Sequence, residues 1–307
     1  MLNEISSLDE LHRVFPDDQS AIDHFRKVRW PRGAICFECG SVKVYTLAGE
    51  WHKCADCNKK FSVRHDTIFA DSKLPLRKWF VAIFLITSHK KGIASAQLAR
   101  DLDITQKSAW HVLHRIREAT AHPAFQRPLL DGTVELDETY VGGKPKNLHA
   151  AGRRIRFTQA RGGKKIVFGM LQRDGDLRLK HVRKIADIKG VIKANVRFGA
   201  SVHTDEAPHF KWMQQPYEHS LVKHSLSEYV RDDVTTNRIE GAFGHFKRAV
   251  VGVYHRISDE HIDRYLSMFA WRWNRREMEE GERVNALLAS TVGHQLTYKA
   301  LTRKEGG

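Results

Sequence analysis

The sequence predicts an α/β protein in which a domain built on a mixed β-sheet follows a small cysteine-rich module and a helical segment. Three observations lead to this fold class. Four cysteines fall in one short window, helical periodicity follows them, and the second half of the chain mixes strand-like with helical segments. We expect an N-terminal helical segment, the cysteine module, a helical pair, the sheet domain and a C-terminal tail, at residues 1–33, 34–66, 74–120, 130–280 and 281–307.

Length and composition limit the class of protein. At 307 residues, the chain can hold one sizeable core together with smaller modules. With 41% hydrophobic and 28% charged residues it is globular, and its four cysteines are too few for a disulfide scaffold. The longest apolar run, Trp79–Ile86, is far below the roughly 20 residues of a membrane-spanning helix. Because no secretory signal is visible at the N-terminus, we expect a cytoplasmic protein.

The four cysteines form two CxxC pairs, Cys36 with Cys39 and Cys54 with Cys57, separated by 14 residues. Each pair places two thiolates on one side of a tight turn, and two such turns supply the tetrahedral sulfur site that Zn²⁺ prefers. The residues between the pairs suit short β-strands, so the spacing predicts a zinc ribbon. Redox-active CxxC pairs and a chance pattern are the alternatives.

Zinc in such a module would be structural, because four thiolates leave no open position for a substrate. A ribbon of this size has almost no hydrophobic core. Its folding would therefore depend on a metal contribution of roughly 10 kcal/mol or more.

Two helices joined by a tight turn are predicted after a buried helix at Leu76–Ile86. The first covers Ile93–Leu102, Asp103–Thr105 form the turn, and the second covers Gln106–Arg117 with Thr105 as its N-cap. This spacing is typical of a helix-turn-helix, although an ordinary helical hairpin has the same pattern. In a helix-turn-helix, four side chains of the second helix would face a DNA major groove: Gln106, Lys107, Ser108 and His111.

Strands and helices are mixed in the second half of the chain. The predicted strands are Val134–Val141, Lys165–Gln172, Leu177–Arg183 and Ala200–Thr204. The predicted helices are Ile188–Val196, a long helix that begins near Thr236, and Asp259–Arg276. Three strands, a helix, a strand and a helix in this order match an RNase H-like fold.

Carboxylates fall on three of these elements. Asp137 lies in the middle of the first strand, Asp205 follows the fourth strand, and Glu240 lies on the long helix. Two divalent ions roughly 4 Å apart need such a set of acids, and Mg²⁺ takes only one or two carboxylates per ion. An Asp can instead cap a turn, and a Glu on a helix usually faces solvent. The neighbouring acids Glu135, Glu138 and Glu206 are interpreted as peripheral.

Positive charge is concentrated beside the first acid. Between Val141 and Ala200 there are 16 Lys and Arg and only three acids, a net of +13 out of +15 for the whole chain. Its densest part, Gly142–Lys165, has no helical or alternating period, so we expect a basic loop. Such runs are usually just solvated, but here the loop follows the Asp137 strand, which favours contact with phosphates. The expected contact residues are Arg153, Arg154, Arg156, Lys164 and Lys165.

Four motifs carry a resemblance to a known family. LDETYVGGK, HTDE, TTNRIEGAFGHFKR and GVYHRIS, behind a CxxC…CxxC module, resemble the DDE-class transposases of bacterial insertion sequences that carry a zinc ribbon, the ISXO2-like group. The resemblance extends from about Phe15 to Arg276. It implies an RNase H-like core that uses Mg²⁺ or Mn²⁺, two ions in all, to cut double-stranded DNA at element ends and join the 3′-hydroxyls to target DNA.

The resemblance also implies site residues. Asp137 and Asp205 match the first two acids of the family. The third position is Asn or Glu within this group, and the chain offers both Asn237 and Glu240; charge favours Glu240 as the metal ligand. Lys247 matches the Lys that often follows the third acid and suits a phosphate beside the metals.

Further residues after the third acid are expected at the DNA. Arg248, Tyr254 and Arg256 are candidates for contact with DNA. Tyr254 and Arg256 would contact the DNA backbone or a flipped base, with ordinary packing as the alternative. Pairing two element ends implies at least a homodimer on DNA, and the bound protein would be associated with the bacterial nucleoid. A DNA-binding regulator that has lost its chemistry and a metal-dependent nuclease are the competing functions.

Overall fold

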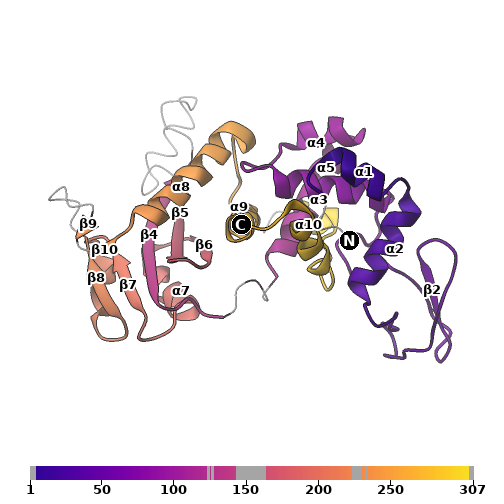
Figure 1. The fold of residues 1–307 in the computed structure, drawn as a ribbon. Helices are drawn as coiled ribbons and strands as arrows, with labels where there is room; N and C mark the ends of the chain where they lie inside the picture. The colour runs from indigo at the N-terminus through magenta and orange to yellow at the C-terminus, as the bar shows by residue number, and fades with distance from the viewer. Residues whose placement is uncertain are drawn as a thin grey trace. The chain divides into compact units, whose positions relative to one another are not determined.

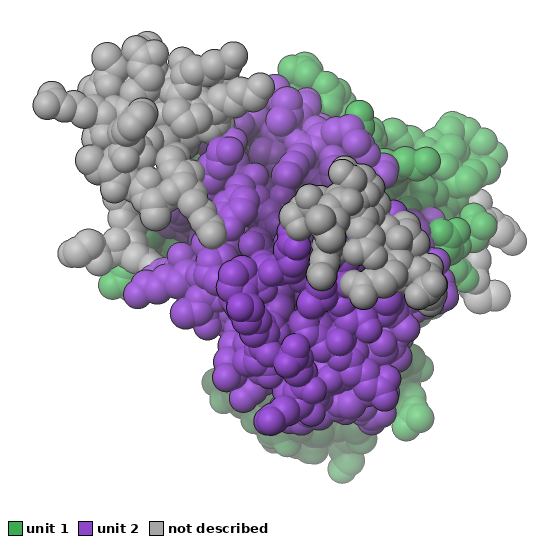
Figure 2. All heavy atoms as spheres, turned by 90° about the vertical axis from the view of Figure 1, so that its left-hand side faces the viewer, with its two compact units in different colours: residues 1–122, 277–307 green, residues 123–276 purple. Residues whose placement is uncertain are grey.

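The computed structural model describes residues 5–122, 125, 128–142, 164–222, 230–231 and 234–303. The chain forms two compact units, coloured separately in Figure 2. Unit 1 comprises Met1–His122 and Glu277–Gly307, and unit 2 comprises Pro123–Arg276.

Unit 1 begins with two short helices, α1 (Leu8–Val14) and α2 (Asp18–Arg29), each started by a capping box at Ser7 and Asp17 respectively. A three-stranded antiparallel sheet follows, in the order β1-β2-β3. Its strands are Val44–Thr46, Trp51–Cys54 and Lys60–Ser62. The cysteine module is therefore a small β-structure, as the sequence predicts.

Helices make up the rest of unit 1 (Figure 1). The buried helix α3 (Leu76–Ser88) is followed by α4 (Ser95–Leu102) and α5 (Gln106–Thr120). Asp103 ends α4 in the left-handed conformation, and the Thr105 side chain accepts the N–H of Ser108 at the start of α5. Residues 281–307, expected as a tail, contribute most of α10 (Glu280–Ala289) and α11 (Tyr298–Thr302).

Unit 2 is built on a five-stranded mixed sheet in the order β6-β5-β4-β7-β8. The strands are β4 (Thr133–Val141), β5 (Lys165–Gln172), β6 (Leu177–Val182), β7 (Ser201–Thr204) and β8 (Glu218–Leu221). β4, β5 and β6 pair antiparallel, while β7 pairs parallel with both β4 and β8. The predicted mixed α/β fold is confirmed, and β8 is a strand that the sequence analysis did not anticipate.

Helices cover both faces of this sheet. One core joins the sheet to the 3₁₀ turn Ile185–Asp187, α7 (Ile188–Asn195) and the 3₁₀ segment η6 (Pro208–Gln214). The other joins it to α8 (Asn237–Ala249) and α9 (Ile262–Asn274). The remaining described elements are β9 (Val230–Arg231), β10 (Val234–Thr235) and a π-helical turn at Val250–Tyr254.

A glycine brings α8 close to the sheet. Gly169 of β5 pairs with Asp137 of β4, and a Cβ atom at Gly169 would lie 2.7 Å from side-chain atoms of both Ile239 and Phe243 on α8. Real Cβ atoms do not approach other atoms so closely. The absence of a side chain at Gly169 therefore lets α8 side chains approach β5 closely, beside the strand that carries Asp137.

Candidate catalytic and metal sites

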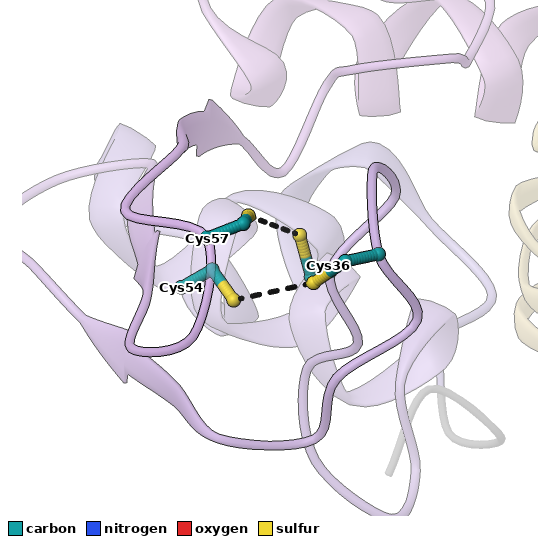
Figure 3. Close-up of side chains that lie close together, drawn as sticks. Cys36, Cys54 and Cys57 are labelled. Carbon is teal, nitrogen blue, oxygen red and sulfur yellow. Dashed lines mark hydrogen bonds between the residues drawn. The ribbon is translucent and has the colours of Figure 1, made fainter.

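The four cysteine Sγ atoms form one cluster in unit 1. All lie within 4.8 Å of one another, and the Cys36–Cys57 and Cys39–Cys54 sulfurs are both 3.6 Å apart (Figure 3). Tetrahedral zinc with Zn–S bonds of about 2.3 Å places its sulfurs about 3.8 Å apart, so the cluster fits the ion. Backbone hydrogen bonding from Cys57 is the largest influence on the Cys54 thiol and lowers its pKa to about 7, whereas burial and a hydrogen bond to Cys36 raise the pKa of Cys57. A lower thiol pKa favours the thiolate form that binds metal.

The three predicted acids of unit 2 lie on the elements that the sequence assigns to them. Asp137 is in β4, Asp205 directly follows β7, and Glu240 is in the first turn of α8. β4 and β7 are parallel neighbours, and α8 packs over the face of the sheet that carries Val141. Because side chains alternate along a strand, Asp137 shares this face with Val141.

The charges of the neighbouring acids act on Asp137. Burial and the negative charges of Asp205, Glu138 and Glu240 raise the pKa of Asp137 to about 8. The backbone N–H of Glu138 donates to Asp137 Oδ1 over 2.7 Å and partly opposes this rise. A carboxyl group held among other acids in this way is suited to binding a cation, which removes the repulsion.

Hard divalent cations such as Mg²⁺ and Mn²⁺ fit this all-oxygen donor set. The acids are spread more widely than the cysteines, which are the only described group of three or more potential ligands with all their atoms within 4.8 Å. Asp205 Oδ1 accepts the N–H of Ala207, and Glu240 Oε1 accepts the hydroxyl of Thr236. These bonds restrict the two side chains before any ion is present.

Two of the acids interpreted as peripheral have specific partners. Glu138 Oε2 lies 3.2 Å from His209 Nε2 of η6, on the sheet face opposite Asp137. Glu135 is fully buried and accepts the N–H groups of Arg238 and Ile239. Glu206 is exposed. The sequence signal for Glu135 was its position two residues before Asp137, on the same face of the strand.

The other predicted residues of α8 and its C-terminal extension differ in exposure. Asn237, Lys247, Arg248 and Arg256 are exposed. Tyr254 is half-buried, with its ring 4.7 Å from that of Tyr265. The first four side chains are therefore accessible from solvent, whereas Tyr254 also has a packing role.

The residues of the helical pair that are predicted to face a DNA major groove lie at the start of α5. Gln106, Lys107 and Ser108 are exposed, and Lys107 Nζ lies 4.5 Å from the centre of the Tyr298 ring. His111 is half-buried, with its Nε2 3.0 Å from the backbone oxygen of Leu296, and burial lowers its pKa. The segment before α11 thus covers His111 but leaves the first turn of α5 accessible.

The predicted phosphate contacts divide into three groups. Arg153, Arg154 and Arg156 lie outside the described residues. Lys164 is exposed. Lys165 donates through Nζ to the backbone oxygen of Ile257 over 2.9 Å and pairs with Asp259 at 2.8 Å, so its charge is engaged within unit 2.

No helix in the described part of the chain is long and apolar enough to cross a membrane.

Comparison with known proteins identifies two regions of the chain. Residues 129–274 match the family model of the ISXO2-like transposase domain, and residues 16–60 match the transposase zinc-ribbon domain. A relative from Halobacterium salinarum, described as an uncharacterized protein in transposable element ISH50, is 26% identical over 281 residues. That match covers 85% of this chain and 92% of the relative.

Two solved structures are more distant. A chain of the simian T-cell lymphotropic virus intasome in complex with PP2A regulatory subunit B56 gamma is 14% identical with a TM-score of 0.27. The match covers 64% of this chain and 65% of the viral chain, less than two thirds of that chain's length. The Mos1 transposase paired-end complex with the left transposon end is 12% identical with a TM-score of 0.21, covering 66% of this chain and 79% of that one.

The resemblance seen in the four sequence motifs is therefore confirmed by the family models. A zinc-ribbon domain precedes the transposase domain in the same order as their motifs in the sequence. The chain carries an ISXO2-like transposase domain at residues 129–274 behind a transposase zinc-ribbon domain at residues 16–60.

Proposed function

We propose that this transposase binds the ends of its insertion sequence and catalyses metal-dependent cleavage and strand transfer of double-stranded DNA. The observation that carries the proposal is the acidic cluster, the set of acids Asp137, Asp205 and Glu240, in which burial, followed by the negative charges of the neighbouring acids, raises the pKa of Asp137 to about 8. Carboxylates brought together from separate elements in this way are suited to holding a cation, which offsets their repulsion.

Asp137, Asp205 and Glu240 would hold two Mg²⁺ or Mn²⁺ ions, with Asn237 as a ligand or as a group that orients one. When bound, the ions supply activation of water or a 3′-hydroxyl and stabilisation of the leaving 3′-oxygen in an in-line displacement. Lys247 lies two turns along α8 from Glu240 and is exposed, so its ammonium group would bind a phosphate of the DNA near the acids.

Further DNA contacts would come from both units. In unit 1, the exposed first turn of α5 would present Gln106, Lys107 and Ser108 to a major groove, with His111 one turn further along. In unit 2, the exposed Lys164, Arg248 and Arg256 would contact phosphates, together with the Arg153, Arg154 and Arg156 segment. Tyr254 would contact the DNA beside them.

Cys36, Cys39, Cys54 and Cys57 would hold one structural zinc ion. The support is the fit of their Sγ separations to a tetrahedral site, together with the ribbon-like antiparallel sheet around them. Two protomers would act together, since each active site has to process one of two paired element ends.

The test is incubation of the purified protein with Mg²⁺ or Mn²⁺ and a plasmid that carries the DNA flanking its own gene. We expect nicks at defined ends and joined products with the wild-type protein. Asp137→Ala and Asp205→Ala should abolish both while DNA binding, measured by fluorescence anisotropy, stays nearly unchanged. Cutting without joining would favour a nuclease, and tight binding with no metal-dependent cutting would favour a DNA-binding regulator.

A further inference from the structure

Glu135 is the most completely buried acid of the described sheet, with a relative exposure of 0%. Its Oε2 atom accepts the N–H of Arg238 over 3.0 Å and the N–H of Ile239 over 3.1 Å. Its Oε1 atom accepts from Arg173 Nε over 3.2 Å. Both oxygens are therefore bonded, one of them to the first turn of α8.

These bonds explain why a charged group is tolerated there. An isolated carboxylate in a protein interior is strongly unfavourable, whereas one that accepts several charge-assisted hydrogen bonds is stabilised. The first N–H groups of a helix have no partners within the helix and carry partial positive charge. Thr236, the residue before α8, makes no side-chain capping bond to them. Glu135, in strand β4, thus caps the N-terminus of α8.

Arg173 fixes the direction of the Glu135 side chain. Besides its bond to Glu135, its Nη2 atom lies 3.3 Å from His203 Nδ1, and His203 is the β7 residue paired with Glu135 in the sheet. Arg173 is itself largely buried, with a side-chain exposure of 13%. The carboxylate is therefore held between the Arg173 guanidinium at one oxygen and the backbone N–H groups of α8 at the other.

The cap connects the strand of the first acid to the helix of the third. Glu135 and Asp137 are two residues apart in β4, about 7 Å along the strand and on the same face. Glu240 is one residue beyond Ile239, whose N–H binds Glu135. Gly169, paired with Asp137, lets the same helical turn approach closely. The position of Glu240 relative to Asp137 therefore depends on Glu135.

We propose that Glu135 is a positioning residue that holds the first turn of α8 against β4, so that Glu240 and Asn237 face Asp137 at the separation that divalent cations require. The proposal rests on the proposed function, because it assigns the acidic cluster to metal binding. Partners of metal ligands typically contribute 10- to 100-fold to metal affinity. Loss of this cap should therefore weaken cation binding without removing any ligand.

The experiment compares Glu135→Gln with Asp174→Asn in the full-length protein. Asp174 pairs with the Arg238 side chain at 3.1 Å, at the same end of α8, but both side chains are largely exposed. Mn²⁺ binding is measured by electron paramagnetic resonance, and amide hydrogen exchange is followed at the start of α8. We expect Glu135→Gln to weaken Mn²⁺ binding roughly 10-fold or more and to speed exchange at Arg238 and Ile239. Asp174→Asn should match the wild type in both.

DNA cleavage adds an independent readout. In Glu135→Gln, the Mn²⁺ concentration for half-maximal cleavage should rise by the same factor, with the rate largely recovered at saturating Mn²⁺. Faster exchange with unchanged Mn²⁺ binding would overturn the proposal, since Glu135 would then only stabilise the helix. If the wild-type protein binds no Mn²⁺, both the proposed function and this assignment fail.

A second variant tests the proposal even if Glu135→Gln does not fold. Arg173→Gln leaves the carboxylate and both amide bonds in place but removes the group that orients Oε1. It should weaken Mn²⁺ binding in the same direction by a smaller factor. Wild-type Mn²⁺ binding in a folded Arg173→Gln protein would contradict the proposed network.

Discussion

The cysteine cluster of unit 1 and the acidic cluster of unit 2 are built in opposite ways. The cysteines come from one stretch of 22 residues, Cys36–Cys57, and their ligand atoms already lie within 4.8 Å. The acids come from β4, the end of β7 and the start of α8, and their charges repel one another. A closed thiolate site suits an ion that stays in place, whereas spread carboxylates leave room for waters and phosphate oxygens.

This difference leads to different expectations for stability. Zinc at the cysteines should be part of the folding of the ribbon, because little core is available there besides Cys36, Cys54 and Phe61. The acidic cluster sits on a sheet with a hydrophobic core on each face, so its unit should fold without metal and carry the repulsion as strain. Four measurements test or sharpen this contrast.

The largest effect is expected from breaking the zinc site. Cys54→Ser should unfold the ribbon, because zinc contributes roughly 10 kcal/mol or more to modules of this kind. Zinc content by a colorimetric chelator and hydrogen exchange at β2 and at β5 provide the measurement. Protection should be lost in β2 and kept in β5. Asp137→Ala is the matched control and should retain zinc; a ribbon that stays protected without metal would refute the contrast.

Removing the charge of Asp137 should stabilise the metal-free protein. Its pKa is about 8 in the folded state and near 3.8 when unfolded, so the folded state holds the proton more tightly. The stabilisation that the folded state gains from protonated Asp137 is complete below pH 4 and is lost as the pH rises to about 8. Asp137→Asn should therefore raise the free energy of unfolding by an amount that grows over this range, on the order of a few kcal/mol at pH 8.

Urea unfolding at pH 5 and pH 8 in the presence of a chelator measures this effect. Glu206→Gln is the control, because Glu206 is exposed and next to Asp205, and it should show no such pH dependence. Saturating Mg²⁺ should stabilise the wild type more than Asp137→Asn. An Asn variant that is less stable than the wild type at pH 8 would show that neither burial nor the neighbouring acids destabilise a charged Asp137.

Crowding α8 should disturb the acidic cluster and leave the cysteine cluster untouched. Gly169→Ala places a Cβ 2.7 Å from side-chain atoms of Ile239 and Phe243, so these buried side chains or the helix that carries them have to move. Overpacking of this kind typically costs about 1–3 kcal/mol. Thermal unfolding and metal-dependent cleavage should both decline. Gly190→Ala in α7, where a Cβ meets nothing within 4 Å, should cause no loss; equal behaviour of the two variants would contradict the close approach.

The smallest effect concerns the basic segment. Replacing Arg153, Arg154 and Arg156 with Ala should flatten the plot of log K for DNA against log salt concentration by about 0.9 per lost phosphate contact. Lys165→Ala should leave the slope unchanged, because Lys165 is already bonded to Ile257 and Asp259. Fluorescence anisotropy over a salt series measures both, and an unchanged slope in the triple variant would rule out phosphate contact.

Much of the organisation was predictable because the signals are short in sequence. CxxC spacing places thiolates on one turn, alternation of apolar residues marks β4 and β6, and a short continuous apolar run marks β5. Thr105 was recognisable as the residue that starts α5, because a capping hydroxyl binds an N–H three residues ahead. The short strand β8 was not predicted, because its half-exposed residues give no strong alternation of apolar and polar side chains.

The sequence by itself determined the spacing of the cysteines, the order of β4, β5, β6, α7, β7 and α8, and the acids on these elements, because these follow from local spacing and periodicity. Only the tertiary structure decided how Glu135, Lys165 and His111 are used. Glu135 binds an amide 103 residues away, Lys165 a carbonyl 92 residues away, and His111 lies against a backbone oxygen 185 residues away. No local pattern encodes such partners, since they meet only when separate elements pack together.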